Sequence, residues 1–559
     1  MSGWEWIALA GVAAVYCLIR LPLFRQPGLL LGWHSDAAVF GLMAREMSEG
    51  TFHFFWWGQS YLGTLTQMFG VVGGWLVAPF AVEPAVGPLA MRIGTSIEWL
   101  LMIVVWWLAL RIAFTPAVAI IVSLLLALGP DWFFWSPLAP RGTEMHLLMS
   151  GAIFVIAAHG LRRRADWLIF GLLSGIGWWM HQGVVFMIAA VFAVIVLRSE
   201  AWAIARSGPS APSPARRLAI RVIDVVLLTF ALSGALHHFM PRVPAFFLHR
   251  PVAEPLVAWL LFRAILEREA WAALWRGRSA WLSNVFTFAG GALVAYSPVI
   301  VARMRGAFEG TYGVAPALRT IDAIAPQAAR LLRTDLWTLM GVPASVFLVV
   351  LLVAHAVRRR RALVSFMLLR PSDYGLRGIA AASIVLAFLF YLLSPRAFAG
   401  AVRYLAPALV VLFAFAIAEA EAWWLSHVPA LRAAAAALVV ALIASYTIDA
   451  MRLVDSTVAG REEGRFYTGP ALARGPSFDP RPVIAAIDRG GWKICYAPFA
   501  VGMNLEWLMD RRVQFISHGS FEPRRALAAR LRAQPGPKCR VDWSGVVTAW
   551  EPAYMLPLP

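Results

Sequence analysis

The chain has 559 residues, of which 60% are hydrophobic and 14% are charged. Soluble globular chains have roughly 45–50% apolar and about 25% charged residues, so this composition excludes a soluble protein. The net charge is +18, and nearly all of the basic residues are Arg. These Arg residues cluster between apolar blocks, as the positive-inside bias predicts, so nucleic-acid binding is not indicated.

Apolar blocks recur along residues 1–454, and most have about the length that a helix needs to cross a bilayer. They predict an all-α polytopic membrane bundle of about 13 transmembrane helices. The predicted spans are 5–23, 93–110, 115–130, 146–160, 167–180, 183–198, 222–240, 253–266, 281–301, 337–357, 379–394, 406–424 and 431–449. The first block lacks a basic n-region and a cleavage site, so it is interpreted as a retained span.

The basic connections predict how the chain is threaded. The segments 162–164, 198–221, 268–278 and 358–361 all fall on one side of the membrane if the N-terminus is cytoplasmic. The polar C-terminal tail then lies on the outer side. The preference for Arg over Lys, and for Ala, indicates a GC-rich bacterial genome, and we expect the chain to be a multi-pass protein of the bacterial inner membrane.

One apolar block, 62–81, does not fit this alternation, because counting it as a span would invert every later loop. It contains four glycines and Gln67, so it is a poor helix on its own. We therefore expect a re-entrant or surface-lying piece packed against protein on the outer side.

Residues 455–559 change character, with more Gly, Pro, Arg and Asp. Strand-like runs at 492–496, 513–516, 540–543 and 545–550 alternate with helix-like stretches at 482–489 and 524–532. This alternation predicts a small soluble α/β domain, extracytoplasmic by the same threading. Cys495 and Cys539 lie in or beside strand-like runs, and a disulfide and two buried thiols are equally consistent with the sequence.

The first outer loop, 24–61, is the richest in polar chemistry. Asp36 follows His34 and opens a helix-like stretch that ends near Ser48. An Asp at a helix start can be an N-cap or a functional acid, and both interpretations stay open. An aromatic and amide cluster follows, which suits either a sugar ring or the membrane interface: Trp56, Trp57, Gln59 and Tyr61.

The second outer loop, 131–145, contains Asp131, Arg141 and Glu144, and His146 follows it. Acids near a membrane are costly unless they are paired or functional. Arg141 and Glu144 are spaced i,i+3 and could simply tie down a helix start. Alternatively, Asp131 or Glu144 approaches Asp36 as a second acid or as a ligand of a divalent metal such as Mg²⁺ or Mn²⁺.

The outer loops 302–334 and 395–404 are rich in Arg, against the positive-inside trend. Arg on the outer side suits bidentate recognition of phosphate, and anchoring to lipid headgroups is the alternative. The candidates are Arg303, Arg305, Arg319, Arg330, Arg333, Arg396 and Arg403, the last beside Tyr404.

In these segments the chain resembles the GT-C superfamily of membrane glycosyltransferases, and within it bacterial relatives of protein O-mannosyltransferases and of the lipid A aminoarabinose transferase. The resemblance lies in the order of parts: HSDAAVFGLMAREM, GQSYLGTLTQMFGVVGG, a proline-containing second outer loop, YSPVIVARMRG, RYLAP and an extracytoplasmic tail. It implies a polyprenyl-phosphate sugar donor, an inverting transfer and Asp36 as the catalytic base. Many members have Asp-Glu where this chain has Asp36-Ala37, and Pro-Pro-Leu where it has the QSYLG segment at 59–63, which leaves metal dependence and the sub-branch open.

The sequence therefore predicts a glycosyltransferase that moves a sugar from a polyprenyl phosphate to a lipid, glycan or protein acceptor at the outer face. Asp36 is the predicted general base, and Asp131 or Glu144 the second acid. The predicted phosphate-binding residues are Arg303, Arg305, Arg403 and Tyr404. The predicted acceptor- or sugar-binding residues are His34, Trp57, Gln59, Tyr61 and Arg141.

Two other functions remain compatible with this pattern. A flippase or transporter of lipid-linked glycans would use the same arginines along a translocation path and would place ionisable residues, such as Arg263, inside spans. An O-antigen-ligase-like transferase would place its base in a large, late outer loop.

Overall fold

The computed structural model describes residues 2–24, 35–57, 62–80, 86–129, 131–138, 142, 144–198, 278–304, 321–331, 342–367, 377–393, 404–458, 480–517, 525–541 and 547–549. The predicted spans at 222–240 and 253–266 lie outside these residues.

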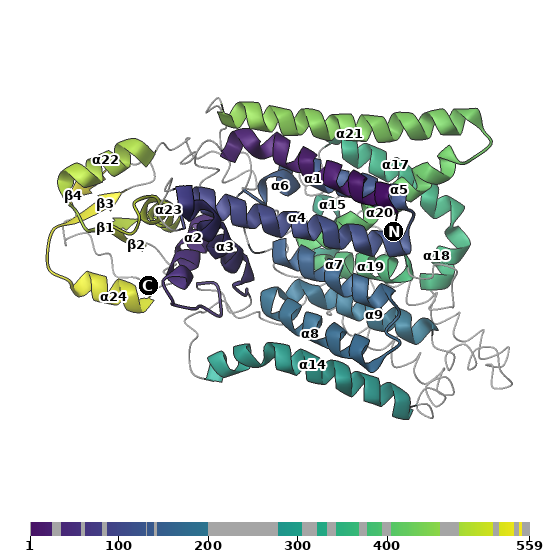
Figure 1. The fold of residues 1–559 in the computed structure, drawn as a ribbon, viewed down its shortest axis with the longest axis horizontal. Coiled ribbons are helices and arrows are strands. Elements are labelled where there is room, and N and C mark those ends of the chain that lie inside the picture. Colours follow the sequence, from purple (N-terminus) through teal and green to yellow (C-terminus); the bar gives the residue numbers. More distant parts are fainter. Residues whose placement is uncertain are drawn as a thin grey trace.

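Long apolar helices form a bundle whose axes run roughly together (Figure 1). Within the described residues, five helices are long and apolar enough to cross a membrane: α1 (Gly3–Phe24), α4 (Pro88–Ala113), α14 (Arg278–Met304), α20 (Ala406–Trp424) and α21 (Pro429–Val458). Other helices lie among them or extend from them: α5 (Pro116–Leu128), α7 (Glu144–Ala158), α8 (Arg164–Met180), α9 (Val185–Arg198), α15 (Ile321–Arg330), α17 (Val342–Arg358), α18 (Arg360–Met367) and α19 (Arg377–Leu393). The described chain is thus a helical membrane bundle, with fewer full-length helices than the 13 predicted spans.

The local sequence explains where α5 begins and where it ends. Thr115 caps α5 by accepting a hydrogen bond from the backbone N–H of Val118 at 3.3 Å. Pro116 occupies the first position, where the missing N–H costs nothing. Gly129 ends the helix at φ +59°, a left-handed conformation that favours glycine.

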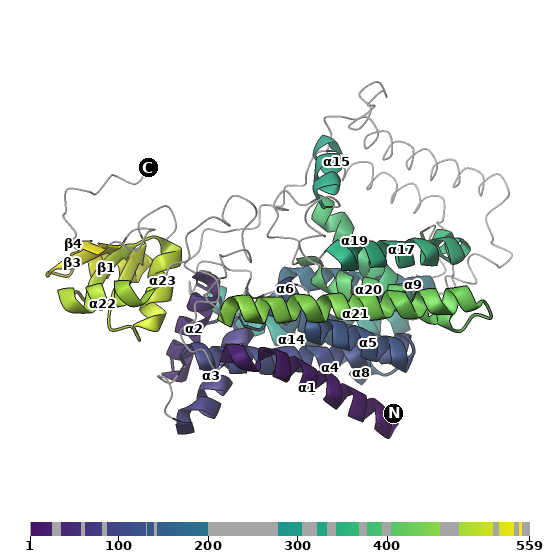
Figure 2. The ribbon, with the colours of Figure 1, turned by 90° about the horizontal axis from the view of Figure 1, so that it is seen from above.

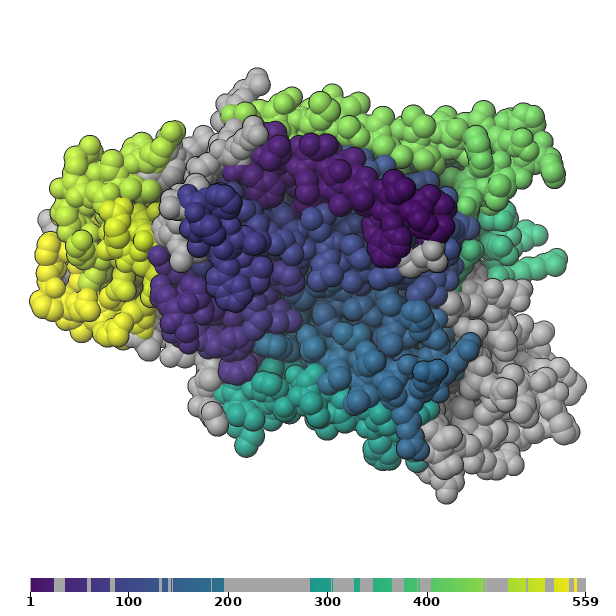
Figure 3. All heavy atoms as spheres, viewed as in Figure 1, coloured from purple at the N-terminus to yellow at the C-terminus, as the bar shows by residue number. Residues whose placement is uncertain are grey.

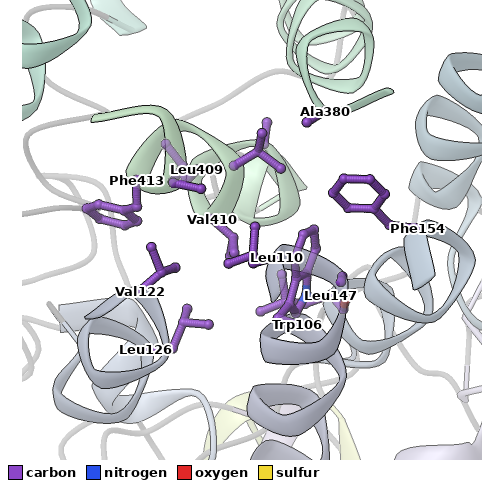
Figure 4. Packing of buried hydrophobic residues seen from close by; sticks show 14 of the residues in the cluster. Trp106, Leu110, Val122, Leu126, Leu147, Phe154, Ala380, Leu409, Val410 and Phe413 are labelled. Atoms are coloured by element: carbon purple, nitrogen blue, oxygen red, sulfur yellow. Dashed lines mark hydrogen bonds between the residues drawn. The ribbon is translucent and has the colours of Figure 1, made fainter. Parts of the chain in front are cut away.

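The bundle core lies where α4, α5, α7, α19 and α20 meet (Figure 4). Trp106 of α4 is fully buried, and its indole N–H donates to the carbonyl of Leu147 at 2.9 Å. Leu110, Val122, Phe154 and Val410 are also fully buried around it. Apolar side chains from segments far apart in the sequence therefore hold the helices together, while the other faces of the long outer helices remain exposed.

The block 62–81 forms α3 (Leu65–Val77) and a short 3-10 turn, and it packs against α4 and α2. Its glycines allow this contact. A Cβ on Gly73 would lie 1.9 Å from the carbonyl oxygen of Ala90, and a Cβ on Gly94 would lie 1.9 Å from that of Phe69. The two backbones touch directly, as small residues permit in membrane helix pairs.

The C-terminal residues contain a four-stranded sheet in the order β2-β1-β3-β4. Its elements are α22 (Pro480–Gly490), β1 (Ile494–Ala497), α23 (Phe499–Leu508), β2 (Gln514–Ser517), α24 (Arg525–Ala533), β3 (Lys538–Val541) and β4 (Val547–Ala549). β1 is parallel to β2 and β3, and β4 is antiparallel to β3. Cys495 and Cys539 face each other in the β1–β3 register and form a disulfide, so the two cysteines are not free thiols.

We call α22 to β4 the sheet unit. It lies at one end of the bundle, and the N-terminus lies at the other end (Figures 1 and 2). Helix α2 (Ser35–Ser48) packs against α23. Figure 3 shows the yellow sheet unit directly beside the purple segment to which α2 belongs. One buried cluster continues from Phe40 and Met43 of α2 to Val501 and Phe515 of the sheet unit. The sheet unit therefore shares a core with the first outer loop.

Candidate functional site

Asp36 lies in the first turn of α2, half-buried, and the helix begins one residue before it. Phe40, one turn later on the same face of α2, is buried and reaches the second outer loop. A Cβ on Gly142 would lie 3.2 Å from Cζ of Phe40, and Gly142 itself has a φ of +81°. The structure thus brings the first and second outer loops together at Phe40 and Gly142. This contact lies one helical turn from Asp36 and two residues before Glu144.

Glu144 is the first residue of α7 and is 2% exposed. Its carboxylate accepts a hydrogen bond from the hydroxyl of Ser136, which directly follows α6 (Asp131–Trp135). The carboxyl group of Glu98 on α4 is close enough to Glu144 to interact with it electrostatically. Glu98 in turn accepts a hydrogen bond from the hydroxyl of Thr66 on α3 at 3.2 Å. Glu98 thus links α4 to α3, and Glu144 links the start of α7 to the end of α6.

A row of three aromatic rings lies where α7, α8 and α20 meet. The rings of His146 and His181 stack with centroids 4.8 Å apart, and the ring of Tyr404 lies 4.8 Å from that of His181. The backbone N–H of Gly183 donates to Nδ1 of His181 at 2.9 Å. His146, Gly183 and Tyr404 line a small cavity together with Ser150. Tyr404 therefore has polar neighbours that can orient a bound group.

The aromatic cluster of the first outer loop divides into two parts. Trp56 is 2% exposed and packs near Phe40 with centroids 6.4 Å apart, so it belongs to the core. Trp57 is half-buried, and the ring of His53 meets it edge-on at 5.7 Å. Trp57 is therefore the described residue of this cluster that is available to contact a ligand.

Several predicted site residues lie outside the described residues: His34, Gln59, Tyr61, Arg141, Arg305 and Arg403. Asp131 begins α6 and Arg303 lies at the end of α14, and only their backbones are described. The described side chains contain no group of three His, Cys, Asp or Glu that could hold a metal ion. The divalent metal accordingly remains a prediction.

Two further polar residues were not among the predicted site residues. Glu98 is one acid within the 26-residue apolar helix α4, and an ionisable residue inside a span is itself a signal of a functional or paired group. His181 ends α8 next to Gln182, at the edge of an apolar block. Their partners come from other helices, so the sequence does not indicate them.

No known protein family matches the chain by its sequence profile, and no curated protein matches it. Among solved structures, the chain is similar to the oligosaccharyltransferase of Archaeoglobus fulgidus in the apo form, with 15% identity and a TM-score of 0.47 over 93% of this chain. It spans 65% of the length of that protein. It is also similar to ArnT from Cupriavidus metallidurans bound to undecaprenyl phosphate, with 14% identity and a TM-score of 0.41 over 97% of this chain and 93% of that one.

These structural neighbours are GT-C glycosyltransferases, as the resemblance in sequence predicted. Likenesses this distant say nothing about the donor, the acceptor or the catalytic base of this chain, which have to be inferred from its own residues.

Proposed function

We propose that the chain is an integral-membrane glycosyltransferase that moves a sugar from a polyprenyl-phosphate donor to a lipid, glycan or protein acceptor, with Asp36 as the general base. The observation that carries this proposal is the contact between the first two outer loops at Phe40 and Gly142, one helical turn from Asp36. The Phe40–Gly142 contact places α2 beside the start of α7, at the same end of the bundle as the sheet unit. A carboxylate on a helix there can meet a lipid-linked donor and an acceptor together.

In the proposed reaction, Asp36 takes the proton of an acceptor hydroxyl while the hydroxyl oxygen attacks the anomeric carbon of the sugar. The bond from that carbon to the phosphate oxygen breaks, and its electron pair leaves with the polyprenyl phosphate. Arg303, Arg305 and Arg403 are the proposed groups that neutralise this phosphate. Attack opposite the leaving group inverts the anomeric centre, in line with the resemblance.

The remaining predicted residues have proposed roles beside this step. Tyr404, backed by His181 and His146, would orient the donor phosphate or the sugar. Trp57 would offer an aromatic face to a sugar ring, with His34, Gln59, Tyr61 and Arg141 as its proposed polar partners. Glu144 is buried and bonded to Ser136, so we assign it to fixing the second outer loop, which leaves Asp131 as the second acid.

The test is turnover of a panel of radiolabelled polyprenyl-phosphate sugars by the purified protein and by Asp36→Asn, with and without divalent metal. Removing a general base costs about 10²–10⁴-fold in rate, and we expect a loss of that size with unchanged thermal stability. Asp166→Asn is the matched control. It changes an acid in the first turn of α8, which accepts a hydrogen bond from the backbone N–H of Arg163 at 2.8 Å, and it should retain activity.

Full activity of Asp36→Asn would refute Asp36 as the base. If neither protein turns over any donor, yet the lipid binds in an arginine-dependent way, the flippase alternative would replace the transferase. The metal arm tests the cation separately, because a dependence on Mg²⁺ or Mn²⁺ should appear in the wild type as loss of turnover with chelator.

A further inference from the structure

The sheet unit is seated on α2 by a contact that requires glycine. A Cβ on Gly41 would lie 2.2 Å from the indole ring of Trp507 on α23. The indole N–H of Trp507 donates to the carbonyl of Val86 at 3.2 Å. This hydrogen bond, to a residue that lies two positions before the start of α4, fixes the orientation of the ring that packs on Gly41 of α2.

Ion pairs extend this interface along the last turns of α2. Arg511, in the turn between α23 and β2, lies 3.2 Å from Glu46 and 3.1 Å from Glu49. Arg45 pairs with Asp510 in the same turn. The Arg511 and Glu46 side chains are 29% and 19% exposed, so water screens this pair less than a fully exposed one.

The turn that carries Arg511 is held in an unusual conformation. Asp510 and Arg511 both have a φ of +57°, a left-handed conformation that non-glycine residues rarely adopt. Backbone hydrogen bonds from Asp510 to the carbonyl of Trp507 at 3.2 Å, and from Arg511 to that of Glu506 at 2.9 Å, fix it. The direction of Arg511 is therefore set by the backbone of the sheet unit.

On the other side of the pair, Glu46 connects to the loop that follows α2. Nε2 of His53 lies 2.6 Å from its carboxylate, and the ring of His53 meets Trp57 edge-on. The loop leaves α2 by a turn in which Gly50, at φ +95°, donates to the carbonyl of Met47 at 3.1 Å, while the N–H of Thr51 donates to the carbonyl of Glu46 at 2.8 Å. This pair of bonds is a Schellman motif, which fixes the path from Glu46 to His53.

The position of Glu46 is electrostatically unfavourable in isolation. It lies close to the C-terminus of α2, where the helix dipole disfavours a negative charge. The positive charge of Arg511 compensates it from one side, and Nε2 of His53 lies within hydrogen-bond distance on another. Contacts thus run without a break from the sheet unit, through Arg511, Glu46 and His53, to Trp57.

We propose that Arg511 is a positioning residue for the acceptor side of the site, because it orders the loop at residues 50–57 through Glu46 and His53. The sheet unit then holds the aromatic face of Trp57 in place for an acceptor. This inference rests on the proposed function, and it assigns the sheet unit a part in that function.

The test compares Arg511→Gln with Arg512→Gln in the full-length protein. Arg512 is the matched control, because it lies next in the chain and pairs with Asp488 inside the sheet unit, at 3.4 Å. Hydrogen exchange at residues 50–57 should quicken in Arg511→Gln and in Glu46→Gln, and stay unchanged in Arg512→Gln. Arg511→Lys, which keeps the charge, should restore most of the protection.

The second arm measures sugar transfer from radiolabelled undecaprenyl-phosphate sugars to endogenous acceptors in membrane vesicles. Arg511→Gln should lose about tenfold in transfer, the size of effect that small displacements of a reacting group produce, with unchanged thermal stability. Unchanged exchange at 50–57 would overturn the coupling, and faster exchange with full transfer would overturn the positioning role. If the wild type itself shows no transfer, the proposed function and the positioning role both fail, and the exchange arm then reports the structural coupling alone.

Discussion

Arg20 near the end of α1 is a charged side chain that is fully buried in the bundle. Its guanidinium donates to the carbonyls of Ala127 at 2.6 Å and Phe134 at 3.3 Å, and it lies over the rings of Tyr16 and Phe134. The carbonyl of Ala127 is among the last of α5, which have no partner within the helix and carry the negative end of its dipole. Arg20 therefore ties α1 to the start of the second outer loop.

We expect Arg20→Met to destabilise the protein by about 1–3 kcal/mol, because two buried carbonyls lose their donor. Thermal unfolding in detergent should show a lower midpoint. Arg432→Met is the control, since Arg432 is exposed and donates only to the nearby carbonyl of Ser426 among its described contacts. Equal midpoints for Arg20→Met and the wild type would contradict this role.

The sequence located individual acids well but not their environments. It placed Asp36 and Glu144 at helix starts, and both lie in the first turns of helices. It did not show that Glu144 is buried against Ser136 or that Glu98 lies near it, because these contacts depend on how α4, α6 and α7 pack. Trp56 and Trp57 are neighbours of one residue type, yet only packing decides that the first is core and the second half-exposed.

At the scale of elements, glycines form the contact between α3 and α4, and the hydrophobic periodicity of the sequence does not predict this contact. Both Gly73 and Gly94 face the backbone of the partner helix, and Gly70 faces Met91. The same glycines make α3 a poor isolated helix and a good partner for α4. That 62–81 is a re-entrant or surface-lying piece stays a prediction, and its partner helix became evident only in three dimensions.

Gly94→Ala should separate α3 from α4, because its Cβ would lie 1.9 Å from the carbonyl oxygen of Phe69, an atom that cannot rotate away. Overpacking of this kind costs about 1–3 kcal/mol, and the thermal midpoint should fall. Gly290→Ala in α14 is the matched control, since a Cβ there meets nothing within 4 Å. It should leave stability equal or slightly higher, by up to about 1 kcal/mol, because Ala favours helix. A Gly94→Ala protein as stable as Gly290→Ala would show that the contact can relax.

In the sheet unit, the elements observed in the structure can be compared with those that short sequence patterns predict. The strand-like runs at 492–496 and 513–516 overlap most of β1 and β2, and the run at 545–550 contains β4, whereas the run at 540–543 begins two residues later than β3. Helix α23 was not predicted, because its segment FAVGMNLEWL is apolar on most sides. The structure explains this composition, since α23 is covered by the sheet on one side and by α2 on the other.

For the whole molecule, the sequence predicted a membrane region ending at 454 and a separate C-terminal domain. In the structure, α21 runs to Val458, and the sheet unit buries Val501 and Phe515 in the same cluster as Phe40 and Met43 of α2. A change of composition marks a change of solvent, from lipid to water, and does not reveal whether two parts share a core. The contact between the sheet unit and α2, the helix that carries Asp36, is therefore visible only in the packing of the folded chain.

The threading of the chain gives the last prediction, that the sheet unit lies outside the cytoplasm. The N-terminus and the sheet unit lie at opposite ends of the bundle, and the basic turn at 162–164 between α7 and α8 is predicted on the cytoplasmic side with the N-terminus (Figures 1 and 2). The Cys495–Cys539 disulfide suits an oxidising compartment, where such bonds persist.

An alkaline phosphatase fused after residue 460 should therefore be active, whereas the same reporter fused after residue 162 should be inactive. Alkylation of Cys495 and Cys539 in intact protein should in turn require prior reduction, because both are held in the bond. An inactive reporter after residue 460 would place the sheet unit, α2 and Asp36 in the cytoplasm. The site would then meet cytoplasmic donors, and a polyprenyl-phosphate sugar presented at the outer face could no longer be its substrate.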